Sequence, residues 1–127
     1  MVGLVLVAHS AGLASEMAAL ARGIAGSGVP VAAAGGTGDG RLGTSIDLIG
    51  KALASVNQGD GVLIIPDLGS SVLTSRLLEV PGQVVVADVP FLEGAIAAAV
   101  AAGAGASLAD VLAAAEEART YRKLGDT

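Results

Sequence analysis

A single histidine, His9, is the residue of this sequence best suited to nucleophilic or proton-transfer chemistry, because imidazole can be a neutral nucleophile and a proton carrier near pH 7. It follows an apolar run, and Ser10, Ala11 and Gly12 come directly after it at the start of a helical pattern. The free N–H groups at a helix start can hold an anion. The sequence therefore predicts anion-handling chemistry at His9, with a structural hydrogen bond as the other role open to a lone histidine.

A second polar segment, DLGSS at residues 67–71, follows another apolar run. If the two runs are neighbouring strands of a parallel sheet, His9 and Asp67 come together at the carboxyl edge, where open α/β sheets bind ligands. The same segment is also a good N-cap for the helix that follows it. Asp88 and Glu93, after a further strand, could form a carboxylate pair, but we interpret both as solvated residues near a helix start.

The segment from residue 34 to residue 45 reads AGGTGDGRLGTS and is expected to be a loop, because glycine is so frequent in it. Gly38, Gly40 and Gly43 fit the G-x-G-x-x-G dinucleotide fingerprint, with Asp60 or Asp67 at roughly the distance of a ribose-binding acid. However, the loop follows the second strand rather than the first, and the chain is short for a dinucleotide fold. A Walker loop would need lysine where this sequence has threonine. The glycines therefore predict either tight turns or a nucleotide site.

Apolar runs of strand length alternate with helical patterns along the chain, as is typical of parallel βαβ units. Strands are expected at residues 2–8, 29–33, 62–65 and 83–87, and helices at 13–25, 45–56, about 69–78, 92–102 and about 107–122. Thr44 or Ser45 is expected to cap the second helix, and the third strand should stop at Pro66, which cannot donate to a ladder. The sequence predicts one α/β domain, residues 1–127, with an open parallel four-stranded sheet and helices on both faces.

The composition excludes several classes of protein. A net charge of −5, a pI near 4.5 and scattered basic residues argue against nucleic acid as a partner. Without cysteine there is no disulfide, thiolate or zinc cluster, and one histidine makes no His-rich site, so we expect neither metal nor cofactor. The longest uncharged stretches, residues 23–38 and 94–109, are shorter than the ~20 residues of a spanning helix. We therefore expect a cytoplasmic protein with no membrane partner.

Four ordered segments of this sequence resemble a known family. They are VLVAHS at the start, AAGGTGDGRLGTS in the middle, IPDLGSS after the third strand and ADVPFLEGA after the fourth. Their order and spacing are similar to those of DhaM, the phosphotransfer subunits of bacterial dihydroxyacetone kinases, over almost the whole chain to about Arg119. The resemblance implies a fold similar to the mannose-family IIA domain of the sugar phosphotransferase system, a homodimer with parallel strand order 2-1-3-4.

By this resemblance, His9 is phosphorylated by the carrier HPr, which is itself charged from phosphoenolpyruvate through enzyme I. His9 then passes the phosphoryl group to ADP held on the nucleotide subunit DhaL, which phosphorylates dihydroxyacetone bound on DhaK. Such a site needs a group that orients the imidazole or takes up its proton, and donors that neutralise the phosphoryl oxygens. The expected orienting residue is Asp67. The expected phosphate-binding residues are Ser10, Thr37, Gly69 and Ser70.

Other interpretations stay open beside this one. They are a mannose-family sugar IIA component, a nucleotide or dinucleotide module that uses Gly38, Gly40 and Gly43, and a dimeric scaffold without transfer activity. The GGTGDG and DLGSS motifs favour dihydroxyacetone over sugar. The segment after Ser71 departs from the family pattern, so no site residue is expected beyond it. Larger relatives carry HPr-like and enzyme-I-like domains behind this one, so we expect a stand-alone form or the first domain of a longer protein.

Overall fold

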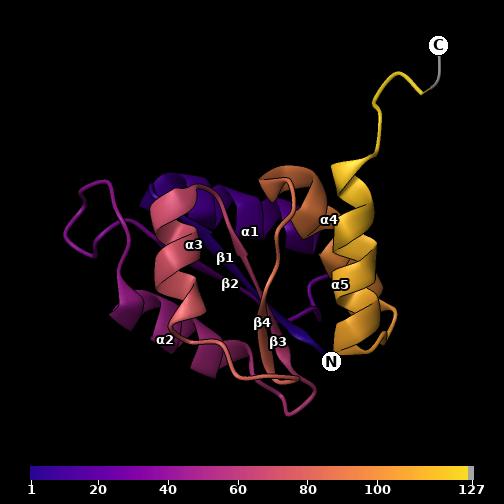
Figure 1. Ribbon diagram of the computed structural model, residues 1–127, viewed down its shortest axis with the longest axis horizontal. Helices are drawn as coiled ribbons and strands as arrows, with labels where there is room; N and C mark the ends of the chain where they lie inside the picture. Colours follow the sequence, from indigo (N-terminus) through magenta and orange to yellow (C-terminus); the bar gives the residue numbers. More distant parts are fainter. Residues whose placement is uncertain (126–127) are drawn as a thin grey trace.

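A computed structural model describes residues 1–125 of the chain as alternating strands and helices (Figure 1). The strands are β1 (Gly3–Ala8), β2 (Val31–Gly35), β3 (Val62–Pro66) and β4 (Val84–Val86). The helices are α1 (Ala11–Ala25), α2 (Ile46–Val56), α3 (Gly69–Arg76), α4 (Phe91–Gly103) and α5 (Leu108–Glu116), and a short 3-10 helix, η1 (Glu117–Arg119), follows. No helix among these residues is long and apolar enough to cross a membrane.

The four named strands form one parallel sheet in the order β2-β1-β3-β4, which confirms the predicted class and strand order. β1 lies between β2 and β3, and every residue of β1 and of β3 is buried. The register pairs Ala8 with Gly35 and Val7 with Pro66. Because parallel strands end at the same edge, the residues that follow β1 and β3 emerge side by side there.

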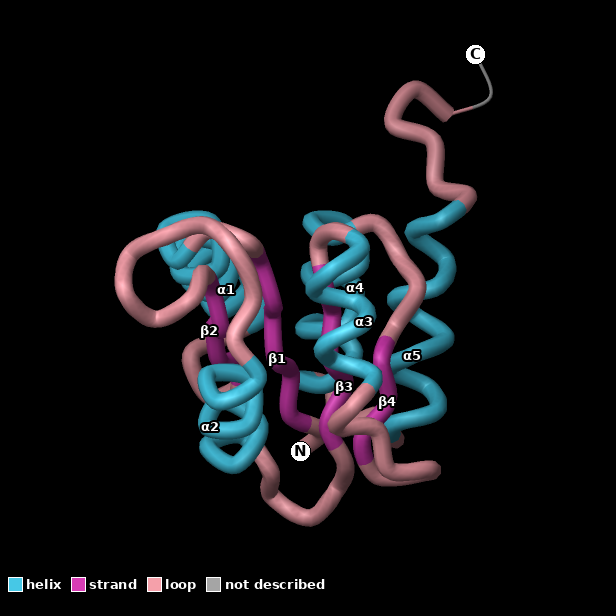
Figure 2. Tube along the Cα trace, turned by 60° about the vertical axis from the view of Figure 1, so that its left-hand side comes forward, coloured by secondary structure: helices cyan, strands magenta, loops and turns pink. Residues whose placement is uncertain are grey.

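Helices cover both faces of the sheet, as predicted (Figure 2). Alternate residues of β1 point to opposite faces, so Leu4 and Leu6 pack in one core cluster and Val5 and Val7 in the other. The first cluster includes buried residues of α1, α4 and α5, and the second includes buried residues of α2. α3 contacts α2, β1, β3 and β4, and it lies on the α2 side in both views.

On the helix side, the first cluster is built largely of alanine. The α4 residues Ala95, Ala98, Ala99 and Ala102 are completely buried, and α4 packs against α1, α5 and the sheet. Because alanine carries only a methyl group, the helix can lie close to its neighbours. These alanines of α4 are therefore packed against the sheet and the neighbouring helices of the same chain.

Several predicted boundaries move by a few residues. β2 begins at Val31 rather than residue 29, and β3 includes Pro66 as its last residue. N–H groups of successive strand residues point to opposite neighbouring strands, so an N–H at position 66 would point toward β4 and not toward β1. Pro66 is tolerated because no strand residue of β4 lies there to accept such a bond. The next ladder bond to β1 comes from the Asp67 N–H to the Val7 carbonyl, 2.9 Å, and β4 has already ended at Val86. α3 and α5 are also shorter than predicted, ending at residues 76 and 116.

Candidate functional site

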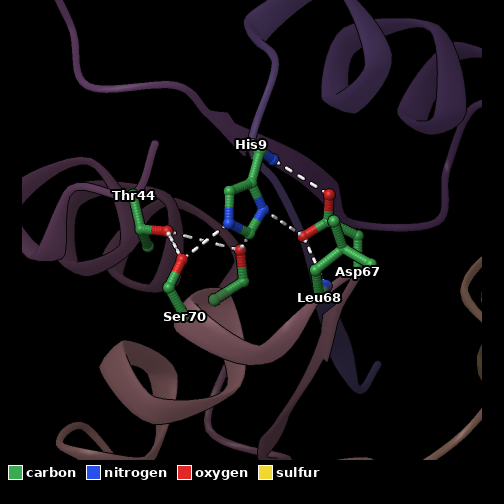
Figure 3. A network of polar contacts seen from close by, with 6 residues as sticks. His9, Thr44, Asp67, Leu68 and Ser70 are labelled. Atoms are coloured by element: carbon green, nitrogen blue, oxygen red, sulfur yellow. Dashed lines mark hydrogen bonds and ion pairs between the residues drawn. The ribbon is translucent and has the colours of Figure 1, made fainter. Parts of the chain in front are cut away.

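The parallel register brings His9 and Asp67 together at the carboxyl edge of the sheet (Figure 3). The ring nitrogen Nδ1 of His9 lies 2.9 Å from Oδ1 of Asp67. The backbone N–H of His9 donates to Oδ2 of the same carboxylate, 3.0 Å. The Asp67 side chain is only 9% exposed, whereas that of His9 is 26% exposed. The carboxylate therefore fixes the imidazole from the inner side, and part of the ring stays open to solvent.

The first turn of α3 places two serine hydroxyls against the imidazole. Oγ of Ser70 lies 2.6 Å from Nε2 of His9, and Oγ of Ser71 lies 3.2 Å from Nδ1. Ser70 is exposed, while Ser71 is fully buried. Both ring nitrogens therefore have polar neighbours, and the open side of the ring lies next to Ser70.

The carboxyl group of Asp67 decides which ring nitrogen carries the proton. Burial alone would raise the pKa of Asp67, but the hydrogen bonds that it accepts from His9, Ser71 and Leu68 outweigh burial and hold the pKa below its ordinary value of 3.8. An ionised carboxylate only accepts hydrogen bonds, so Nδ1 of His9 is the protonated donor in this pair. In the neutral imidazole, Nε2 then carries the free lone pair, and the Ser70 hydroxyl donates to it.

The lowered pKa of Asp67 predicts a contribution to stability that depends on pH. It is fully present above the ordinary value of 3.8 and is lost as the pH falls through the lower folded value. We expect the difference in free energy of unfolding between the wild type and Asp67→Asn to shrink below about pH 4, as measured by urea unfolding down to about pH 2. Asp88→Asn, which alters an exposed carboxylate outside this network, is the control. A difference that stays constant through this range would contradict the prediction.

Three other predicted phosphate-binding residues lie at different distances from this network. The Ser10 hydroxyl accepts from the Leu13 N–H, 3.3 Å, and so caps α1. Gly69 is the first residue of α3, where the N–H groups have no partner within the helix. The Thr37 hydroxyl donates to Asp39 inside its own loop, and no contact joins it to His9 among residues 1–125. The structure thus brings Ser70 to the ring, whereas the hydroxyl of Thr37 is bonded within its own loop.

Two residues of this network, Ser71 and Thr44, were not predicted as site residues from the sequence. Thr44 contributes a hydroxyl 3.1 Å from Ser70 Oγ and 3.4 Å from Ser71 Oγ, although the sequence suggested only a cap for α2. That cap is Ser45, whose hydroxyl accepts from the Leu48 N–H. Ser71 could have been found because it directly follows Ser70, which was already expected at the site, whereas Thr44 is 26 residues from Ser70 and no local pattern marks it. The alternative role of DLGSS as a side-chain cap is wrong, because the N-cap of α3 is Leu68 and makes no such bond.

The glycine-rich loop makes turns and closes on the end of β1. Gly38, Gly40 and Gly43 all have positive φ, at 93°, 89° and 143°, which favours glycine. The Gly43 N–H donates to the His9 carbonyl, 2.9 Å. The two acids considered for a ribose are occupied elsewhere, since Asp67 binds His9 and Asp60 pairs with the Met1 amino group at 2.6 Å.

The carboxylates after β4 do not form a pair with each other. Glu93 lies 3.6 Å from the Lys123 ammonium group, and Asp88 is exposed. Within residues 1–125, no cluster of three or more histidine, aspartate or glutamate side chains is arranged to hold a metal ion. At the carboxyl edge, the structure brings together an oriented imidazole, an ionised carboxylate, hydroxyls and the N–H groups of a helix start.

Comparison with known proteins identifies relatives of this chain. The model of the EIIA-man family, described as PTS system fructose IIA component, matches residues 3–112. Two phosphoryl donor subunits DhaM of PEP-dependent dihydroxyacetone kinases from Listeria innocua are similar to this chain. The DhaM subunit of dihydroxyacetone kinase 2 is 32% identical to this chain over 106 residues, which cover 79% of this chain and 85% of the relative. The DhaM subunit of dihydroxyacetone kinase 1 is 36% identical over 99 residues, which cover 76% of this chain and 78% of the relative.

Longer relatives and a solved structure extend the comparison. The DhaM subunit of Escherichia coli K12 is 33% identical over 121 residues, which cover 88% of this chain but 26% of that protein. A crystal structure of a protein of unknown function, EF1359, superposes with a TM-score of 0.83 at 28% identity and covers 98% of both chains. Together with the family match over most of its length, these similarities show that the chain belongs to the EIIA-man family of phosphotransferase-system IIA components.

Proposed function

We propose that this protein is a phosphohistidine carrier, which accepts a phosphoryl group from HPr on His9 and passes it to ADP bound on DhaL for phosphorylation of dihydroxyacetone on DhaK. The observation that carries the proposal is the pairing of Nδ1 with the ionised Asp67 carboxylate, which leaves the lone pair of Nε2 beside Ser70 at an exposed edge. The names of the DhaM relatives support the kinase system as its context.

The proposed transfer balances without the loss of a proton. The lone pair of His9 Nε2 attacks the phosphorus of the donor's phosphohistidine, a new N–P bond forms, and the donor's N–P bond breaks with its electron pair returning to the donor nitrogen. Nδ1 keeps its proton, so the phosphorylated ring is positively charged, and the Asp67 carboxylate 2.9 Å away balances that charge. In the second transfer, a terminal phosphate oxygen of ADP attacks the phosphorus, and the electron pair returns to Nε2.

The groups around Nε2 can neutralise the phosphoryl oxygens. The Ser70 hydroxyl is already at hydrogen-bond distance from Nε2. The N–H groups of the first turn of α3, including that of Gly69, lack helix partners, and a helix N-terminus favours negative charge. The Thr37 hydroxyl would have to give up its hydrogen bond to Asp39 before it could donate to the phosphoryl group. We therefore assign the phosphate contacts to Ser70 and Gly69, with Ser10 holding the start of α1 beside them.

The second candidate is a sugar-specific IIA component of the mannose type, which the description of the family model as a fructose component favours. This function would use the same nitrogen of His9 and differ only in the acceptor. The relatives of similar length are DhaM subunits, so we place dihydroxyacetone first. A nucleotide-binding module has no such support, since the three glycines of the fingerprint make turns that close on β1.

Mass spectrometry of the intact protein at neutral to alkaline pH tests the proposal. After incubation with phosphoenolpyruvate, enzyme I and HPr, we expect a gain of one phosphate that mild acid removes. Addition of DhaL, DhaK, ADP and dihydroxyacetone should then remove the phosphoryl group from the protein. If the protein is phosphorylated but these components do not remove its phosphoryl group, the sugar pathway is favoured. If active donors never phosphorylate the protein, the carrier function is excluded. A reaction without HPr serves as the control.

We also propose that the protein acts as a homodimer in the cytoplasm. The dimer is supported by the family resemblance alone. The alanines of α4 do not add support, because they are buried against other parts of the same chain. Sedimentation equilibrium measures the oligomeric state directly. A mass equal to one chain at all concentrations would exclude the dimer without affecting the chemistry proposed for His9.

A further inference from the structure

Thr44 lies at the end of the glycine-rich loop and contacts both serines that surround the His9 ring (Figure 3). Its hydroxyl is 3.1 Å from Ser70 Oγ and 3.4 Å from Ser71 Oγ. Thr44 itself is half-buried and makes no direct bond with the imidazole. Any effect of the Thr44 hydroxyl on the His9 ring is therefore expected to pass through one of the serines.

The backbone on both sides of Thr44 is fixed, so this contact is built into the fold. Before it, the N–H of Gly43 donates to the His9 carbonyl, 2.9 Å. The φ of 143° at this glycine, and a Cβ that would lie 2.7 Å from the methyl group of Thr37, exclude larger residues there. After it, the Ser45 hydroxyl accepts from the Leu48 N–H and caps α2. The loop thus holds the residue between a bond to β1 and a helix start.

A count of hydroxyl protons gives the direction of the hydrogen bonds. Each hydroxyl has one proton to donate. The proton of Ser70 goes to the lone pair of Nε2, and that of Ser71 goes to the Asp67 carboxylate, whose pKa it helps to lower. Neither serine has a proton left for the other contact, so the Thr44 hydroxyl must be the donor. The shorter distance selects the oxygen of Ser70 as its main acceptor.

We propose that Thr44 is a positioning residue, which holds Ser70 as a hydrogen-bond donor toward Nε2; this inference rests on the proposed carrier function. A chain of donors runs from Thr44 to Ser70 to Nε2, and each bond in such a chain strengthens the next. Once a phosphoryl group occupies Nε2, its lone pair is gone, and the Ser70 proton turns to a phosphoryl oxygen. Thr44 continues to donate to the Ser70 oxygen, so Ser70 stays a donor to the site in both states.

The test measures how fast HPr phosphorylates Thr44 and Ser70 variants. Thr44→Val has nearly the same shape but no hydroxyl, and we expect it to slow phosphorylation by about three- to tenfold, the usual effect of one hydrogen bond. Thr44→Ser keeps the hydroxyl and should restore most of the rate. In a Ser70→Ala background, Thr44→Val should change the rate by less than about twofold, because the residue through which Thr44 acts is gone.

The outcomes separate this inference from the proposed function. If active donors never phosphorylate the wild type, the carrier function fails. If the wild type is phosphorylated and Thr44→Val matches it, or slows the reaction equally in the Ser70→Ala background, the positioning role is overturned. The nitrogen-15 chemical shift of Nε2 in the unphosphorylated protein should also change in Thr44→Val, while that of Nδ1, held by Asp67, should not. Thr44→Ala replaces Thr44→Val if the valine variant does not fold.

Discussion

Replacement of His9 with glutamine is expected to abolish phosphorylation by HPr, with a loss of at least about a thousandfold, because no other group at the site is a nitrogen nucleophile. The sequence contains no second histidine and no cysteine, so the reaction has no substitute acceptor of that kind. The readout is the gain of one acid-labile phosphate in the intact mass. Phosphorylation of His9→Gln at a rate near that of the wild type would contradict the assignment of Nε2.

The fold should survive this substitution, which makes the loss of transfer interpretable. The side chain is partly exposed at the sheet edge, and the Asp67 carboxylate keeps two bonds, from the backbone N–H groups of His9 and Leu68. The bond from the Gly43 N–H to the carbonyl of residue 9 also involves only backbone. We expect the midpoint of thermal unfolding to change by a few degrees at most, about 1 kcal/mol of unfolding free energy.

The second large effect is predicted at Gly35, the last residue of β2, which pairs with Ala8. A Cβ at this position would lie 2.5 Å from the Ser10 carbonyl oxygen and 2.7 Å from the Cα of Ala11, both backbone atoms that cannot move aside alone. Gly35→Ala should therefore push the start of α1 away from the sheet. We expect a loss of about 2–3 kcal/mol in unfolding free energy, or a decrease of about 6–15 °C in the unfolding midpoint.

Gly50→Ala is the matched control for Gly35→Ala. Gly50 lies inside α2, and a Cβ there would meet nothing within 4 Å. Alanine is the better helix former, so this substitution should raise the unfolding free energy by about 0.5–1 kcal/mol. Calorimetry on both variants measures the contrast. If the two variants have the same stability, the close approach of β2 to α1 does not control stability.

The fold was predictable because the pattern of apolar runs repeats without interruption, and the order of the strands followed from the family resemblance. The pairing of His9 with Asp67 was predictable for the same reason, since two residues that follow neighbouring parallel strands emerge at one edge. The structure adds which ring nitrogen carries the proton. That assignment needs the distances from Asp67 and Ser70, which no spacing in the sequence contains.

The roles of the loop residues were not predictable from local patterns. Thr37 and Thr44 lie in the same glycine-rich loop. The hydroxyl of Thr37 donates to Asp39, whereas that of Thr44 lies at hydrogen-bond distance from the serines of α3. Which way such side chains point depends on a run of positive φ angles, and these arise from the tertiary fold. The start of β2 was misplaced because Val29, two residues before it, is also apolar and buried, so composition alone does not mark where pairing begins.

The alanine-rich core has a consequence for how stability varies with temperature. Unfolding exposes aliphatic side chains of alanine, valine, leucine and isoleucine rather than aromatic rings, since the chain has one phenylalanine, one tyrosine and no tryptophan. The heat capacity of unfolding rises with the apolar area exposed, and it averages about 12–15 cal/mol/K per residue in globular proteins. A buried alanine exposes less apolar area on unfolding than a larger side chain, so the many buried alanines contribute little to the heat capacity change and favour a broader, flatter curve of unfolding free energy against temperature.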